Sequence, residues 1–76
     1  MELDVLRADL ADAEWRVAER ARHVSAQRAV VAELERTGGN SAQPRRLLDV
    51  LERMQEKHIA ERNRLAAELA AARGGN

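Results

Sequence analysis

Hydrophobic residues in the first half of the chain recur in alternating steps of three and four. Counted in this way, they form one line of ten positions, the seam: Leu3, Leu6, Leu10, Ala13, Val17, Arg20, Val24, Gln27, Val31 and Leu34. The first position of each heptad (a) is always apolar, whereas the fourth (d) is polar in the middle of the run. This period is typical of an amphipathic helix that packs as a coiled coil. No glycine or proline interrupts it, so it predicts one long helix over about residues 2–36.

A second run has the same period. Its seam consists of Leu48, Leu51, Gln55, His58, Arg62, Leu65, Leu69 and Ala72. Four more apolar residues widen this seam on either side: Leu47, Met54, Ile59 and Ala66. The pattern predicts a helix over about residues 42–72 that contacts more than one neighbour, followed by a frayed tail at 73–76.

The stretch LERTGGNSAQP between the two runs contains signals that end one helix and begin the next. Gly38 or Gly39 can adopt the left-handed conformation that closes a helix. Asn40 or Ser41 can cap the following helix, and Pro44 falls in its first turn, where a missing N–H costs least. These signals favour a tight turn at about residues 37–41 over a flexible linker.

Two further features support a turn that folds the chain back on itself. If Asn40 is the cap, Gln43 takes the third helical position and can form a pair like that of a capping box. Charges of opposite sign also come together in an antiparallel hairpin. The acids of residues 1–14 come beside Arg62, Arg64 and Arg73, and Glu33 and Glu35 come near Arg45 and Arg46.

The small size of the chain predicts an oligomer. A chain of 76 residues without cysteine and with a single aromatic residue cannot bury a large core alone. A two-helix hairpin would also leave the wide stripe of the second helix uncovered. We therefore expect an all-α protein, one domain over residues 1–76, whose antiparallel hairpin forms a homodimer as a four-helix bundle.

Charge and composition narrow the possible functions. The 13 basic and 13 acidic residues balance, which argues against a dedicated nucleic-acid-binding protein. The start of the sequence is acidic and amphipathic, unlike a secretory signal, and no apolar run could span a membrane. The cytoplasm is the expected location. Ser25 and Ser41 have no base and acid at a catalytic spacing, so no catalytic residue is assigned.

Polar residues occupy the middle of both seams. Arg20, Gln27, Gln55, His58 and Arg62 are expected to form a polar layer at the middle of the hairpin, with His58 opposite Arg20. Such layers fix helix register and oligomeric state. A pocket for a partner or small molecule is the main alternative. A metal site at His58 and Glu61 is conceivable, but the additional carboxylates of a di-iron bundle are missing, and no metal or cofactor is assigned.

Trp15 takes position f, which faces away from the seam. Three alanines flank it at helical spacing: Ala8, Ala11 and Ala18. A large aromatic residue framed by small residues is typical of a contact surface, within the bundle or for another protein. The alternative is that Trp15 lies flat under neighbouring arginine side chains. His23 is interpreted as a solvated surface residue.

The segments ERARHVSAQRAVVAELERTGGN and LLDVLERMQEKHIAERNRLAAEL together resemble a group of short uncharacterised alphaproteobacterial proteins. These look like helical hairpins with an AELER end to the first helix and an H-x-A-x-R-x-R-L segment, here His58 to Leu65. The resemblance covers roughly residues 14–69 and departs at Pro44. It implies a helical hairpin of bacterial origin and no particular activity.

The function that these features favour is a small non-enzymatic module for protein–protein interaction or regulation, acting through helix–helix contacts with a protein partner not identified by the sequence. The alternative is a nucleic-acid-associated accessory protein that uses the basic start of the second helix: Arg45, Arg46, Arg53 and Lys57.

Overall fold

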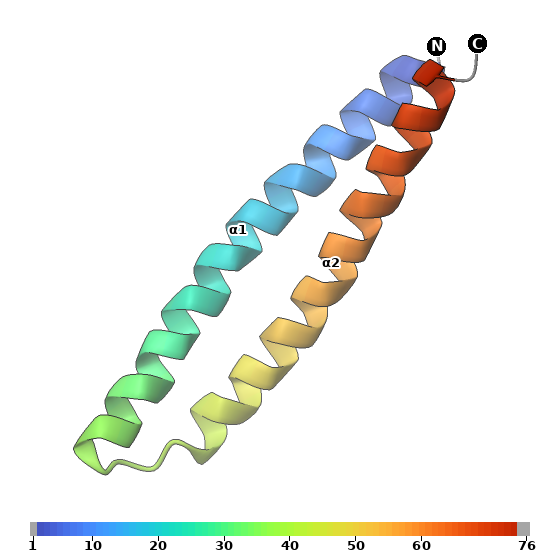
Figure 1. Cartoon of the computed structure of the whole chain (residues 1–76). Helices are drawn as coiled ribbons and strands as arrows, with labels where there is room; N and C mark the ends of the chain where they lie inside the picture. The colour runs from blue at the N-terminus through green and yellow to red at the C-terminus, as the bar shows by residue number, and fades with distance from the viewer. Residues whose placement is uncertain (1, 75–76) are drawn as a thin grey trace.

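The computed structural model describes residues 2–74, which form an antiparallel hairpin of two long helices (Figure 1). Helix α1 spans Glu2–Thr37 and helix α2 spans Ala42–Gly74. The start of α1 and the end of α2 lie side by side at one end, with the turn at the other (Figure 1). The molecule is a thin rod with extents of 59 × 14 × 14 Å. The predicted all-α antiparallel hairpin is thus confirmed.

The predicted seam of α1 faces α2 throughout. All ten of its positions are buried or half-buried, and Ala13, Val24 and Val31 are the buried ones. In α2 the seam residues from Leu48 to Leu69 are likewise buried or half-buried, whereas Ala72 is exposed. Because only two helices enclose this seam, no large side chain among residues 2–74 is fully buried.

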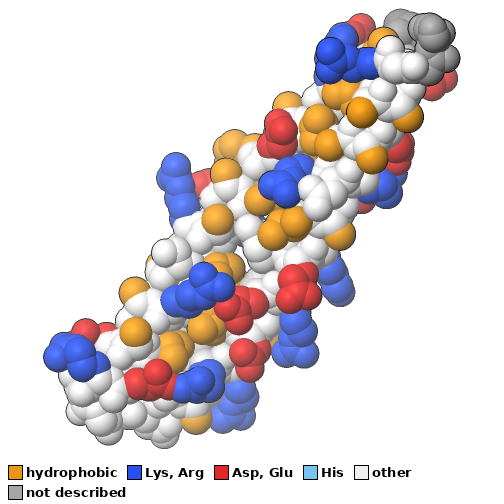
Figure 2. Space-filling model, viewed as in Figure 1, with side chains coloured by type: hydrophobic (Ala, Val, Ile, Leu, Met, Phe, Trp, Pro, Cys, Tyr) orange, Lys and Arg blue, Asp and Glu red, His pale blue; other side chains and the backbone are white. Residues whose placement is uncertain are grey.

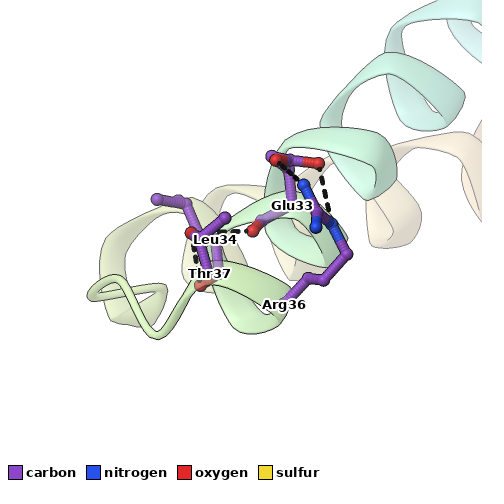
Figure 3. A network of polar contacts seen from close by, with 4 residues as sticks. All are labelled: Glu33, Leu34, Arg36 and Thr37. Carbon is purple, nitrogen blue, oxygen red and sulfur yellow. Dashed lines mark hydrogen bonds and ion pairs between the residues drawn. The ribbon is translucent and has the colours of Figure 1, made fainter.

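A glycine cap ends α1. Gly38 has a φ of 77°. The N–H of Gly39 donates to the Leu34 carbonyl oxygen at 2.8 Å, and the N–H of Gly38 donates to the Glu35 carbonyl oxygen at 3.4 Å. These two bonds satisfy carbonyl groups that the end of a helix would otherwise leave unpaired. The Thr37 hydroxyl donates to the carbonyl oxygens of Glu33 and Leu34 as well (Figure 3). Only residues 38–41 lie between the helices, so the connection is a tight turn.

The start of α2 differs in one detail from the expectation. The Asn40 side-chain oxygen accepts a hydrogen bond from the Ala42 N–H at 3.0 Å, and the Ser41 carbonyl oxygen accepts one from the Arg45 N–H at 2.9 Å. Ser41 therefore occupies the cap position, because its carbonyl group accepts the first bond of the helix. Gln43 is then the second helical residue, so the predicted pairing with an Asn40 cap is wrong.

The two helices are joined by ion pairs near the turn. Arg45 pairs with Glu35, as the charge pattern predicts, and Arg28 pairs with Glu52 at 2.7 Å, which the sequence pattern did not predict. The expected roles of Glu33 and Arg46 in this cluster are wrong. Glu33 pairs with Arg36 on its own helix (Figure 3), and Arg46 donates to the carbonyl oxygen of Ala42, one turn back along α2.

At the other end, Asp9 and Asp12 of α1 line a hollow with Arg64 of α2, as the charge pattern predicts, but no ion pair among the described residues joins the two helices there. The ion pairs described there form within each helix: Arg7 with Asp4, Arg16 with Asp12, and Arg64 with Glu61 and Glu68. Side chains three or four residues apart already lie together on a helix surface, so the local partners are reached first.

The end of α2 extends further than the sequence predicts. Arg73 and Gly74 are helical, although fraying was expected from residue 73. The alanines at 70–72 explain the difference, because alanine is the residue that favours helix most. The remainder of the predicted tail, residues 75–76, lies outside the described residues.

Candidate interaction face

Two glutamines of the seam bind the backbone of the opposite helix. The Gln55 Nε2 atom donates to the Val17 carbonyl oxygen at 2.8 Å, and the Gln27 Nε2 atom donates to the Pro44 carbonyl oxygen at 2.9 Å. Both bonds are partly buried, and both carbonyl groups lie within helices. The Gln55 Oε1 atom is buried without a hydrogen-bond partner among the described residues. The polar seam positions therefore hold one helix to the other at two defined places.

The register of the hairpin spreads the predicted polar layer along the rod. In the four cross-helix contacts the residue numbers add to 71, 72, 80 and 80, so residues whose numbers add to about 76 lie level with one another. Arg20, Gln55 and His58 are thus together at mid-rod. Gln27 is two turns, about 10 Å, nearer the turn, and Arg62 lies toward the opposite end. That this layer sets register remains a prediction.

His58 and Arg20 line a shallow hollow of about 410 Å³ at mid-rod. Its walls are Trp15, Arg16, Glu19, Arg20, His23 and His58. A metal site at His58 would need Glu61 as a second ligand, but Arg64 binds the Glu61 carboxylate. Within residues 2–74, no three histidine or acidic side chains gather where they could hold a metal ion.

Glu61, Arg64 and Glu68 form a charged cluster on the surface of α2. The Arg64 guanidinium donates to both oxygens of Glu61, at 2.9 and 2.7 Å, and also binds Glu68. The hydrogen bonds from Arg64 lower the pKa of Glu61, and the two carboxylates raise the pKa of Arg64. A lowered carboxyl pKa means that this cluster supports the helix at neutral pH and loses that contribution as the pH falls through the pKa of folded Glu61.

The exposed large hydrophobic residues gather on one long face. In residues 2–74 they are Val5, Trp15, Val30, Leu47, Val50 and Met54. When the seam is numbered as positions a and d in both helices, five of these residues occupy position c or g. Trp15 takes position f, which is adjacent to c. We call the surface formed by these six residues the apolar face. Val5, Val30 and Val50 had no assigned role in the sequence, although Leu47, Val50 and Met54 repeat at the same three–four spacing as the seam.

Surface hollows show that positions c and g of the two helices share this face. One hollow joins Val5 of α1 to Glu68 of α2, and another joins Asp12 and Arg16 to Glu61 and Arg64. The two cross-helix ion pairs, Arg28–Glu52 and Glu35–Arg45, lie at positions e on the opposite side of the rod. We call that side the ion-pair face. Figure 2 shows acidic and basic side chains meeting over the turn-proximal half of one face.

The structure separates the apolar residues that flank the seam of α2. Leu47 is 49% exposed and Met54 is 36% exposed, both on the apolar face. Ile59 is half-buried and lines a hollow with Arg28 and Glu52 on the ion-pair face. The three residues therefore do not form one uncovered flank, and the uncovered apolar surface is that of Leu47, Val50 and Met54.

Trp15 lies at the edge of the apolar face. Its side chain is 62% exposed, so the neighbouring arginines leave most of the indole open. The alanines predicted to frame it are exposed as well: Ala8, Ala11 and Ala18. The indole lines the mid-rod hollow with His23, which is also exposed. A role of this stripe in binding remains a prediction.

The basic residues of α2 are engaged to different extents. Arg45 is ion-paired with Glu35 across the turn. Arg46 and Arg53 each donate from Nε to a backbone carbonyl oxygen one turn back, at 3.5 and 3.4 Å. Lys57 is exposed near mid-rod. The four residues of the nucleic-acid alternative are therefore not equally available to phosphate groups.

Within the described part of the chain, neither helix has an apolar stretch long enough to cross a membrane. Comparisons with protein-family models, with curated proteins and with solved structures found no match. The resemblance to short alphaproteobacterial hairpin proteins therefore remains a prediction, and the apolar face carries the functional argument.

Proposed function

We propose that this protein is a non-enzymatic protein–protein interaction module that acts through helix–helix contacts on its apolar face, and that it forms a homodimer as a four-helix bundle. The observation that carries the proposal is the gathering of Val5, Trp15, Val30, Leu47, Val50 and Met54 on one face of a rod. Single exposed hydrophobic residues are ordinary on protein surfaces, but a shared apolar surface indicates a contact site.

The thinness of the hairpin supports the same proposal. Two helices cover one seam, and Ala13, Val24, Val31, Leu65 and Leu69 are the only hydrophobic residues that it buries within residues 2–74. Fully burying one large aliphatic side chain stabilises a protein by roughly 1.5–3 kcal/mol. A partner that covers Val30, Leu47 and Val50 would therefore add materially to a small core.

The nucleic-acid alternative has weaker support. Pairing with Glu35 neutralises Arg45, one of its four basic residues. The chain also has no net positive charge to attract a polyanion.

Val50→Asp tests the proposed function. Val50 is 44% exposed, so the hairpin should fold, but a carboxylate on the apolar face should weaken every contact that this face makes. The control is Ala67→Asp, which adds the same charge at an exposed position f of α2. Tagged variants would be used to capture proteins from the native host, with quantification by mass spectrometry.

We expect the Ala67→Asp protein to retain its bound proteins, including untagged copies of the chain, and Val50→Asp to lose at least 90% of them. Equal capture by the two variants, both helical by circular dichroism, would show that the apolar face is not the interaction surface.

A further inference from the structure

We propose that the apolar face binds a second copy of this chain in a single orientation, with the two turns at the same end of a four-helix bundle. This inference rests on the proposed homodimer and adds the face through which the two chains bind and their relative orientation. In this arrangement the two-fold axis runs along the rods. Helix α1 of each chain then packs against α2 of the other, and residues at the same level face each other.

The geometry fixes which residues meet. Residues of α1 and α2 lie level when their numbers add to about 76, and a two-fold axis along the rod preserves that level between chains. On facing helices, position c lies opposite position c, and g lies opposite g. The pairing across the interface can therefore be read directly from the sequence.

With one exception, apolar residues meet apolar residues in this pairing; the exception is Met54, which lies level with the partner's His23. Val30 lies level with the partner's Leu47, and Ala26 lies level with the partner's Val50. Toward the opposite end, Val5 lies level with the partner's Ala71. All of these residues are exposed in the single hairpin, and the two-fold axis repeats each contact.

Charged residues meet the opposite charge in the same pairing. Asp12 lies level with the partner's Arg64, and Arg16 lies level with the partner's Glu61. These side chains already alternate in sign along each helix, through the pairs Asp12–Arg16 and Glu61–Arg64. Two such helices in antiparallel contact would extend both pairs into one network.

Mid-rod adds one more pair of opposite charges, whereas the far end sets two like charges level with each other. Glu19 lies level with the partner's Lys57. Asp9, however, lies level with the partner's Glu68, and both are acidic. Glu68 is bound by Arg64 of its own helix, which reduces this repulsion.

The reverse orientation, with the turns at opposite ends, fits less well. In that orientation α1 packs against the partner's α1, and α2 packs against the partner's α2. The two-fold axis then crosses the rods near the level of residue 20, which is the middle of each rod. Leu47 and Val50 would then face the charged stretch around the partner's Arg64, and Glu19 would face its own copy. Removing those charges from water against apolar groups is unfavourable, and like charges repel.

The size of the face is sufficient for a stable dimer. A face of 59 × 14 Å has an area of about 800 Å², which is what a standard protein interface buries on each partner.

Spin labels on single cysteines test the orientation, because the chain has no cysteine of its own. Ala8→Cys and Arg36→Cys place labels near the two ends of α1, at exposed f positions beside the c and g positions that would face the partner. With the turns together, both intermolecular distances should be below about 30 Å, since a bundle is two helices wide. With the turns apart, the two axial separations add to about 84 Å, so at least one exceeds about 40 Å.

Pulsed dipolar spectroscopy on each labelled protein gives these distances, with circular dichroism to verify that the helices are retained. Two short distances would support the proposal. One long distance would overturn the orientation while leaving self-association through helix contacts intact. The absence of any intermolecular distance at 100 micromolar would show that the partner is not a second copy, whereas an interaction with a different protein would still be detected by the Val50→Asp capture experiment.

Discussion

Leu65→Ala should lower the free energy of unfolding by about 2–4 kcal/mol, the cost of removing a buried leucine side chain. Leu65 is 6% exposed and belongs to the small set of residues that the two helices bury. The lost methyl groups cannot be replaced by neighbours, because the hairpin has one thin seam. Urea unfolding followed by circular dichroism measures the change.

Leu47→Ala is the matched control, because it removes the same atoms from a side chain that is 49% exposed. At concentrations low enough to separate the chains, its cost should be about 1 kcal/mol or less. Equal losses for the two variants at every dilution would contradict the assignment of Leu65 to the core and Leu47 to the contact face.

Gly38→Val should lower the free energy of unfolding by about 1–2 kcal/mol, because an L-residue with a side chain is strained in the left-handed region. Gly38 has a φ of 77°, and no atom lies within 4 Å of the place where a Cβ would be. The loss would therefore come from backbone conformation and not from a clash.

Gly38→Asn distinguishes backbone strain from the mere presence of a side chain, since asparagine adopts the left-handed conformation more readily than valine. We expect Gly38→Asn to retain at least half of the stability that Gly38→Val loses, measured by thermal unfolding. A loss as large for asparagine as for valine would mean that the turn does not depend on the left-handed geometry of this residue.

The fold could be predicted from the sequence because its signals are local and repeated. The seam positions are separated by three or four residues, and every one of them in α1 is at least half-buried. The glycine cap at Gly38 and the proline in the first turn of α2 also act within a few residues. Such signals need no knowledge of the second helix.

The apolar face was harder to predict, because it exists only when two helices are placed side by side. Val5 and Val30 of α1 stand far apart in the sequence, and the repeat of Leu47, Val50 and Met54 in α2 does not show that it shares a face with them. Ile59 appeared equivalent to Leu47 and Met54 until the register placed it beside Arg28 and Glu52. The same limit applies to the ion pairs: Glu35 binds Arg45 across the turn as predicted, whereas Glu33 binds Arg36 of its own helix.

The polar seam shows a different limit. Side-chain types predicted polar residues in the interior, but not that Gln27 and Gln55 would bind backbone carbonyl groups of the opposite helix. Those bonds depend on the axial offset of the helices, which follows from the length of the turn and the packing of the seam together.

Self-association through the apolar face underlies both proposals, and sedimentation equilibrium across a dilution series measures it. We expect a dimer at micromolar concentration that dissociates on dilution, with helix content and thermal stability falling as the monomer appears. A monomer with full helix content at every concentration would contradict it.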